Sequence, residues 1–285
     1  MQNPPNIQAA FVYLVKAGEE HLLATSLLLL QQRFLRKWPY PVLVFLDDTA
    51  SAYQLLHFHV AIPAGVQAHF VRLHDFSRFP EGFPEGFDSS HYGRMVHTNR
   101  DFPSYNHMIR FWWRQVFHHP IVRELDYYVR MDTDSFILSD IDYDFIYSMQ
   151  QDGLTYGYVA EGFDGPEFTT GLFDFVADYL DSHVAARELA FRNNLWLPDP
   201  EDRDKHGPHL FYNNFEVVSV QRLISNAQYM EFVDAVDQSY NIYWYRWGDA
   251  PLRFYAAKLA LQYDMEVRIL CGIDYYHQGR LDRTC

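Results

Sequence analysis

Cysteine is scarce in this chain of 285 residues, and its two cysteines, Cys271 and Cys285, both lie near the C-terminal end. They do not form a zinc-binding pattern, which requires several closely spaced ligands. They also do not suggest the disulfide framework that is typical of small secreted proteins. We therefore expect a protein of a reducing compartment.

Long hydrophobic runs and secretion signals are also lacking. The longest aliphatic run, residues 27–30, is far shorter than the ~20 residues that cross a bilayer. Residues 1–10 are polar and lack the basic and then apolar pattern of a signal peptide, and no Asn-x-Ser/Thr sequon occurs. We expect a soluble intracellular protein, cytoplasmic and without a membrane span.

Positive charge is in deficit, with 37 acidic against 23 basic residues and a formal net charge of -14. This balance argues against nucleic acid or an anionic membrane as a partner, although single basic side chains can still bind a diphosphate. A Gly-x-Gly-x-x-Gly turn is absent after the first predicted strand, which disfavours the usual dinucleotide fold.

The hydrophobic pattern predicts alternating strands and helices. A continuous apolar run at residues 9–15 predicts a buried strand, residues 19–34 have helical spacing, and residues 41–46 predict the next strand. Further strands are predicted at 127–136 and 155–160, with helices at 104–117 (Ser104 as N-cap) and 169–180 and a short one ending near 151. Residues 187–207 are predicted to be a polar connection, and residues 76–88, with two Phe-Pro-Glu-Gly repeats, an ordered loop. The alternation favours an α/β fold, and the length allows one large domain or two smaller ones.

The chemistry is expected in residues 127–136. If this segment is one extended strand, Arg130, Asp132 and Asp134 project from the same face. Carboxylates roughly 7 Å apart repel each other when both are ionised, and a divalent cation removes that cost. An Asp-x-Asp pair after a hydrophobic strand is typical of the metal and diphosphate site of nucleotide-sugar glycosyltransferases. The alternative is an ordinary turn, in which Asp accepts backbone N–H groups.

Four other charged positions have two readings each. Glu216 lies among bulky apolar residues, so it is either paired structurally or held for chemistry. Asp249 precedes a predicted helix and is either its N-cap or part of a site. Arg110 and Arg114 share a helix face and bind either nearby acids or a phosphate.

Taken together, the motifs resemble the fungal α-1,2-mannosyltransferases of glycosyltransferase family 15. The matching segments, in chain order, are residues 104–111, 128–134, 140–144, 214–216, 246–251 and 275–277. The resemblance implies a single GT-A-type domain over residues 1–285, with a mixed, mostly parallel central sheet flanked by helices. Within it, a nucleotide-sugar half covers roughly residues 1–150 and an acceptor and metal-completing half roughly residues 151–285.

The family also implies Mn2+ (or Mg2+) and a nucleotide-sugar donor, GDP-mannose. Carried over to matching positions, Asp132 and Asp134 are the acidic pair at the metal and donor, and His277 completes the metal site. The family motif is commonly Glu-Pro-Asp, whereas this chain has Asp132-Thr133-Asp134, which is one methylene shorter at the first acid. Fungal members also carry a membrane anchor and stem, which we do not expect here.

The remaining site residues follow from the same resemblance. Glu216 matches the carboxylate proposed near the anomeric carbon, Tyr105 a tyrosine near the donor, and Asp249 an acid close to the acceptor. Arg130 is expected to offset charge on the leaving diphosphate, and Lys16, which follows the first strand, to contact the donor. Aromatic residues that could stack on acceptor sugars are Tyr212, Tyr243, Trp244 and Trp247.

The sequence thus predicts a metal-dependent retaining glycosyltransferase that transfers a hexose, mannose from GDP-mannose, to a hydroxyl of a glycan acceptor. One alternative is a catalytically inactive nucleotide-sugar or carbohydrate-binding protein on the same fold. A metal-dependent hydrolase is a further alternative, which would require a second metal cluster or a dedicated water-activating base.

Overall fold

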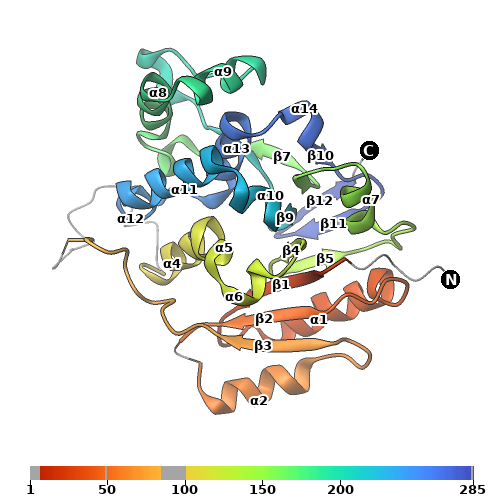
Figure 1. Cartoon of the computed structure of the whole chain (residues 1–285). Helices are drawn as coiled ribbons and strands as arrows, with labels where there is room; N and C mark the ends of the chain where they lie inside the picture. Colours follow the sequence, from red (N-terminus) through yellow and green to blue (C-terminus); the bar gives the residue numbers. More distant parts are fainter. Residues whose placement is uncertain (1–6, 49, 85–100, 284) are drawn as a thin grey trace.

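The computed structural model describes residues 7–48, 50–84, 101–283 and 285. Its centre is a seven-stranded sheet with helices on both faces (Figure 1). In spatial order the strands are β10 (Val267–Ile269), β6 (Tyr156–Tyr158), β9 (Phe215–Ser219), β4 (Tyr127–Met131), β1 (Ala9–Val15), β2 (Val42–Leu46) and β3 (Ala68–Arg72).

The sheet is mixed but mostly parallel, as predicted. All neighbouring strands run parallel except β9, which is antiparallel to β4 on one side and to β6 on the other. Two small antiparallel sheets accompany it. One has the order β12 (Arg280–Arg283), β11 (Asp274–His277) and β5 (Ser135–Ile137); the other joins β7 (Glu161–Phe163) to β8 (His209–Phe211).

The helices follow the strands in the chain. In order they are α1 (Glu20–Leu30), α2 (Ala52–Ala61), α4 (Ser104–Arg110), α5 (Val116–His118), α6 (Pro120–Arg123), α7 (Phe145–Gln151), α8 (Leu172–Ser182), α9 (Val184–Arg192), α10 (Val220–Ser225), α11 (Ala227–Ser239), α12 (Asn241–Trp244), α13 (Asp249–Ala260) and α14 (Tyr263–Glu266). π-helical segments extend α1 (Gln31–Leu35) and join α4 to α5 (Phe111–Gln115), and 3-10 turns cover Pro166–Phe168 and Pro200–Lys205.

The continuous apolar run of β1 is explained by burial on both faces. Successive side chains of a strand point to opposite faces, and here Phe11 and Tyr13 pack with Leu27 of α1, whereas Ala10 and Val12 pack with Trp112 on the other face. Because both faces of the strand are covered by helices, every position has to be apolar. The sheet thus separates two hydrophobic cores.

The predicted strand at 127–136 does not exist as one strand. β4 ends at Met131, and the backbone N–H of Ser135 donates to the carbonyl of Asp132 at 3.0 Å, which closes a turn. After the turn, β5 leaves the main sheet and pairs with β11. Asp132 and Asp134 therefore lie in a tight turn, not on one face of an extended strand.

Other differences concern single elements. The predicted polar connection at 187–207 begins inside helix α9 and contains the 3-10 turn Pro200–Lys205. Pro103, not Ser104, occupies the N-cap of α4, and the Ser104 hydroxyl donates to the carbonyl of Asp101 at 2.6 Å. In the predicted loop at 76–88, the rings of Phe79 and Phe83 stack with their centres 4.6 Å apart. Residues 85–88 of this loop lie outside the described part of the chain.

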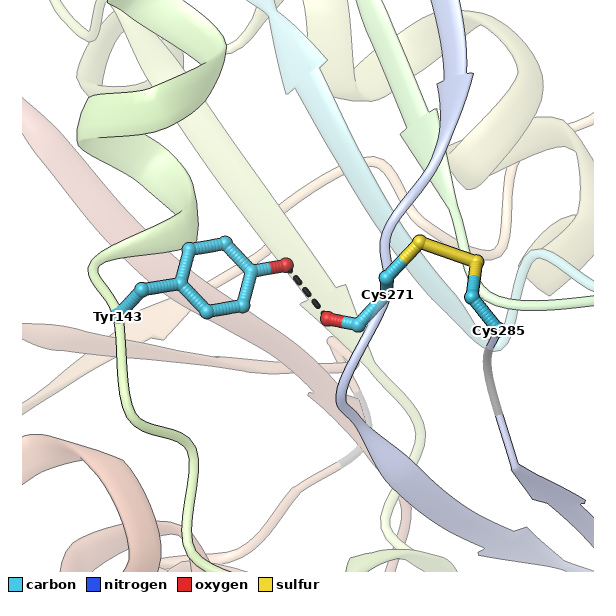
Figure 2. Close-up of a disulfide and its surroundings, with 3 residues drawn as sticks. All are labelled: Tyr143, Cys271 and Cys285. Carbon is cyan, nitrogen blue, oxygen red and sulfur yellow. Dashed lines mark hydrogen bonds between the residues drawn. A yellow bond between two sulfur atoms is a disulfide. The ribbon is translucent and has the colours of Figure 1, made fainter.

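Cys271 and Cys285 form a disulfide, which the sequence analysis did not predict (Figure 2). The cause is the register of the β11–β12 hairpin, in which Asp274 pairs with Arg283. This pairing brings the residues just outside the hairpin together, with the two cysteine Cα atoms 5.1 Å apart. The hydroxyl of Tyr143 donates to the carbonyl of Cys271 at 2.7 Å and holds the base of the hairpin (Figure 2).

Among the described residues, we find no helix that combines the length and the apolar character required to cross a membrane.

Candidate active site

A cavity of about 820 Å³ lies at the carboxyl edge of the main sheet. Lys16 follows β1, Asp47 follows β2 and Asp132 follows β4, and all three line the cavity. Because β1, β2 and β4 run parallel, their carboxyl ends meet at one edge, which is where open α/β sheets bind ligands. The volume falls within the range of pockets that hold small-molecule and cofactor ligands.

Three residues in this cavity have the arrangement of a metal site. Asp132, Asp134 and His277 each offer one ligand atom, and these atoms all lie within 4.8 Å of one another. Nε2 of His277 is 3.0 Å from a carboxylate oxygen of Asp134. The turn after β4 supplies both acids, and the end of β11 supplies the imidazole. His277 pairs with Ser135, the residue after Asp134, and this pairing brings the imidazole to the turn.

The imidazole of His277 is oriented by contacts to its Nδ1. Its Nδ1 lies 2.7 Å from Nδ2 of Asn214 and 3.1 Å from the hydroxyl of Tyr212, while Oδ1 of Asn214 accepts from the Tyr275 hydroxyl at 2.7 Å. The opposite nitrogen, Nε2, is buried and faces the carboxylate of Asp134. An oriented imidazole whose buried nitrogen points at one carboxylate, with a second carboxylate beside it, fits a divalent cation.

The two acids of the turn have different electrostatic surroundings. Burial raises the pKa of Asp132 and outweighs the opposing effects of Arg130 and His277. Burial also acts to raise the pKa of Asp134, but hydrogen bonds from His277 and Gln278 prevail and lower it. Gln278 donates to Asp134 at 3.0 Å. A divalent cation would favour the ionised form of both carboxylates.

Arg130 connects the metal turn to the far wall of the cavity. Its side chain is only 3% exposed, its guanidinium carbon lies 4.4 Å from the centre of the Trp112 ring, and Nε donates to Asp132 at 3.1 Å. Its Nη1 donates to Asp249. Burial acts to lower the pKa of Arg130, but the carboxylates of Asp132 and Asp249 outweigh it and raise the pKa above its ordinary value. The guanidinium therefore remains a fixed cation in the cavity.

Asp249 lines the cavity and is not a helix cap. Gly248 occupies the N-cap of α13, and Asp249 is the first residue of the helix. The carboxylate is buried and accepts from Arg130 and, at 2.8 Å, from Nδ2 of Asn213. The predicted N-cap role of Asp249 is therefore wrong, and its role as a site residue stays a prediction.

Glu216 does not line the cavity. Its carboxylate is fully buried and accepts from the hydroxyls of Tyr128 and Tyr156 at 2.9 and 2.8 Å, and it lies 3.3 Å from Nε of Arg253. In the β4–β9 pairing Glu216 stands directly opposite Arg130. Opposite residues of an antiparallel pair project side by side from the same face, so Glu216 lies beside Arg130. Its contacts are those of a structurally paired carboxylate.

The other predicted contacts divide clearly. Lys16, Tyr105 and Tyr212 line the cavity. Tyr243 and Trp247 are buried in the core and cannot stack on a ligand. The remaining acceptor candidate, Trp244, does not belong to the cavity lining.

Arg110 and Arg114 bind acids, which agrees with the structural reading of that pair. Arg110 donates to Asp237 at 2.6 Å, and Arg114 donates to Asp234 at 2.8 Å. These contacts occupy both guanidinium groups on the side of α11, so the phosphate reading has no support in the described structure.

Several cavity residues were not singled out for a role from the sequence. Glu19 accepts from the hydroxyl of Thr133 at 3.1 Å, so a third carboxylate borders the acidic turn. Asn213, Asp164 and Arg246 also line the cavity. Arg246 stands within a matching motif, but no spacing pattern in the sequence identifies Glu19 or Asp164, because tertiary folding alone brings them here.

Comparison with known proteins agrees with this geometry. A family model described as glycolipid 2-alpha-mannosyltransferase matches residues 2–284. The chain is 27% identical over 278 residues to alpha-1,2 mannosyltransferase KTR1 of Saccharomyces cerevisiae, covering 96% of this chain and 69% of that protein. It is 27% identical over 287 residues to glycolipid 2-alpha-mannosyltransferase 1 of Candida albicans, covering 95% of this chain and 62% of that protein.

Solved structures share the fold. The X-ray structure of the mannosyltransferase Ktr4p from S. cerevisiae in complex with GDP superposes with a TM-score of 0.85 at 21% identity, covering 99% of this chain and 74% of that one. Core-mannan synthase A from Aspergillus fumigatus, in its Mn/GDP form, gives a TM-score of 0.83 at 19% identity, covering 97% of this chain and 76% of that one. The predicted fold class is confirmed.

Proposed function

Because this chain belongs to the glycolipid 2-alpha-mannosyltransferase family, we propose that it transfers mannose from GDP-mannose to a hydroxyl group of a glycan acceptor. The observation that carries the proposal is the convergence of the Asp132, Asp134 and His277 triad with the Arg130–Asp249 ion pair in one cavity at the carboxyl edge of the sheet. The GDP complex of Ktr4p supports the choice of nucleotide.

The metal of the proposed reaction is Mn2+ or Mg2+, held by Asp132, Asp134 and His277. The buried Nε2 of His277, which faces the carboxylate of Asp134, supports this assignment, and the Mn/GDP form of core-mannan synthase A supports manganese. When bound, the cation neutralises charge on the departing diphosphate. Asn214 and Tyr212 orient the imidazole from its other nitrogen.

The chain's own side chains supply the remaining contacts. Arg130 keeps a positive charge beside the donor because guanidinium does not titrate in proteins and its two carboxylates raise its pKa further. Lys16 is the proposed contact to the nucleotide at the end of β1, and Tyr105 the proposed contact to the donor on the opposite wall. Asp249, fixed by Arg130 and Asn213, accepts a hydrogen bond from the acceptor hydroxyl.

We propose that transfer retains the configuration at the anomeric carbon. The mannose of GDP-mannose is α-linked, and relatives such as KTR1 are named alpha-1,2 mannosyltransferases, so an α product implies retention. In the reaction the bond between C1 and the diphosphate oxygen breaks and a bond from C1 to the acceptor oxygen forms. The proton of the acceptor hydroxyl leaves with the nucleotide product.

Glu216 receives a supporting role in this proposal. A nucleophile must reach the anomeric carbon, whereas the Glu216 carboxylate is fully buried and bonded to two tyrosines and Arg253. Glu216 lies beside Arg130 on the neighbouring strand, and its carboxylate is one of those that raise the pKa of that arginine. We therefore propose that Glu216 positions Arg130 and does not contact the sugar.

The proposal keeps one domain with two functional halves. Residues from roughly the first 150 provide the donor edge and the acidic turn. Residues from roughly 151 to 285 provide His277, Asp249 and the acceptor wall.

The test is an incubation of the protein with Mn2+, methyl α-D-mannopyranoside and a panel of nucleotide sugars. We expect GDP release only with GDP-mannose, together with an α-linked dimannoside in the NMR spectrum. GDP release that does not depend on acceptor would favour a hydrolase. GDP binding in calorimetry without turnover of any donor would favour the inactive binding protein.

A further inference from the structure

One wall of the cavity has no part in the metal site and borders Tyr105, the proposed donor contact. It consists of Asp164, Phe168, Arg246 and Gly248, and Asp249 follows directly in the chain. Asp249 is also bonded to Arg130, which pairs with Asp132 of the acidic turn. The wall therefore adjoins Asp249, the proposed contact to the acceptor.

Arg246 is held in an unusual conformation. Its φ is 58°, in the left-handed region that residues other than glycine rarely adopt. Its guanidinium carbon lies 4.6 Å from the centre of the Tyr105 ring and 4.4 Å from the centre of the Phe168 ring. Within the described part of the chain, no hydrogen bond or ion pair uses its N–H groups. The two rings thus fix a planar cation whose donors remain available to a ligand.

Asp164 is fixed through its backbone. Its N–H donates to the carbonyl of Pro208 at 3.0 Å, and a Cβ at Gly207 would lie only 1.8 Å from the Asp164 carbonyl oxygen, so residue 207 has to be glycine. One carboxylate oxygen accepts from the N–H of Gly165 at 2.9 Å. The other lies 3.5 Å from where a Cβ of Gly248 would stand, so that glycine leaves the space beside the carboxylate open.

We infer that this wall is an acceptor subsite, in which the free carboxylate oxygen of Asp164 and the N–H edge of Arg246 bind neighbouring hydroxyls of the acceptor sugar. The inference rests on the proposed function. A pyranose presents hydroxyls that act as donors and acceptors at once. A fixed carboxylate accepts their protons and a fixed guanidinium donates to their oxygens, and neither group loses rotamer freedom on binding because both are already ordered.

The same guanidinium could instead bind the diphosphate of the donor, and the experiment separates the two cases. The variants are Asp164→Asn, Arg246→Gln and Arg246→Lys, with Asp178→Asn on the exposed side of α8 as a matched control. For each we would measure the KM for methyl α-D-mannopyranoside and, by calorimetry in Mn2+, the Kd for GDP. GDP binding also reports that the variant is folded.

We expect the acceptor KM to rise by about tenfold or more in the Asp164 and Arg246 variants, since each loses a charge-assisted hydrogen bond. The Kd for GDP is expected to stay within about twofold of the parent value, which corresponds to about 0.4 kcal/mol. Unchanged acceptor KM values in all three variants would overturn the inference. A weakened GDP complex in the Arg246 variants with normal acceptor KM would overturn it in favour of a donor contact.

Acceptors that lack single hydroxyls at C3, C4 or C6 provide a readout that a structural role would not change. With the parent protein, one of these deoxy acceptors should show the same rise in KM that Asp164→Asn shows with the complete acceptor. With the Asp164→Asn variant, removing that hydroxyl should raise the KM no further. Independent, additive losses for every deoxy acceptor would contradict the assignment. A parent chain that turns over no GDP-mannose with any sugar acceptor would instead refute the proposed function, and the subsite with it.

Discussion

Nδ2 of Asn214 lies 2.7 Å from Nδ1 of His277, so an amide of the strand-edge segment before β9 orients an imidazole near the end of the chain. Asn214 is fixed in turn by the Tyr275 hydroxyl, which also lies 2.6 Å from Oγ of Ser135 at the start of β5. This network ties the C-terminal hairpin to the acidic turn. The proposed metal site therefore depends on residues that are not among its three proposed ligands.

The first prediction concerns this amide. Asn214→Ala should weaken Mn2+ binding by about 10- to 100-fold, because contacts behind the ligands hold them in the orientation that binds the metal. Titration calorimetry with Mn2+ measures the change. Asn213→Ala is the matched control, since Asn213 donates to Asp249 instead, and it should leave the affinity for the metal alone nearly unchanged. Equal losses in the two variants would refute the role of Asn214.

The second prediction separates structure from catalysis at Glu216. Glu216→Gln should lower the free energy of unfolding by about 3–5 kcal/mol, because it leaves the buried Arg253 without its counter-charge. Urea denaturation measures this loss. Asp152→Asn, which breaks the exposed pair with Arg268, should cost far less. A Glu216→Gln variant of unchanged stability and abolished transfer would contradict our assignment and favour direct contact with the sugar.

The third prediction concerns the disulfide between Cys271 and Cys285. Its 14-residue separation leads us to expect that the double variant Cys271→Ser/Cys285→Ser loses about 3 kcal/mol of unfolding free energy. Mn2+ affinity should also fall, because β11 carries His277. Denaturation and metal titration of the parent protein, with and without reductant, give the comparison; identical Mn2+ affinity in both forms would uncouple the hairpin bond from the metal site.

The same bond gives a way to test the expectation of a reducing compartment, which stays a prediction. Disulfides persist in oxidising surroundings and are rare where thiols are kept reduced. Alkylation of the native protein without reductant, followed by mass spectrometry, should detect no modified cysteine. Full alkylation of both residues would support the original expectation instead.

The fourth prediction is a pH dependence of stability. Burial lowers the pKa of His107 from 6.5 to about 4, with Arg110 acting in the same direction and Asp48 opposing it. The unfolded chain then binds a proton near pH 6.5 that the folded chain does not accept until about pH 4. The free energy of unfolding should therefore fall as the pH drops from about 6.5 to about 4. Above about pH 6.5 it should not change with pH on account of His107.

Measuring unfolding free energy against pH, with His107→Gln as the comparison, tests this effect. The variant cannot take up the proton, so its stability should vary less with pH between about 6.5 and 4. The Nδ1 of His107 lies 2.9 Å from the Tyr243 hydroxyl, and glutamine keeps a polar group near that position. Parallel pH profiles of the two proteins would assign the dependence to other groups.

The sequence was most informative where local rules and burial agree. β1 was predicted with its observed bounds because a strand covered on both faces has to be apolar throughout. The α/β alternation followed from the same pattern, whereas the mixed, mostly parallel sheet followed from the resemblance to the family. The metal triad came from the resemblance to a family, and the structure brings its three residues together.

The failures have a common cause, which is that tertiary contacts decide what local patterns cannot. The residues at 127–136 favour a strand, yet the strand ends before Asp132 and the two acids lie in a turn. The N–H of Asp132 donates to the carbonyl of Asn214 at 3.2 Å and stabilises this turn. Glu216 has the same neighbours in sequence whether it faces a ligand or Arg253, and only the fold distinguishes the two. The disulfide depends on a hairpin register that cysteine spacing does not encode.

The strand that carries His277 does not belong to the seven-stranded sheet, because among the described strands β11 pairs with β12 and β5 alone. A protease that cuts just before this hairpin would leave every strand of the large sheet in place, and the cut segment would stay attached through the Cys271–Cys285 bond until that bond is reduced. Reduction would then release the segment that carries His277, one of the three proposed metal ligands. Preparations of this protein should therefore be checked for an intact C-terminus before low activity is ascribed to the wrong substrate.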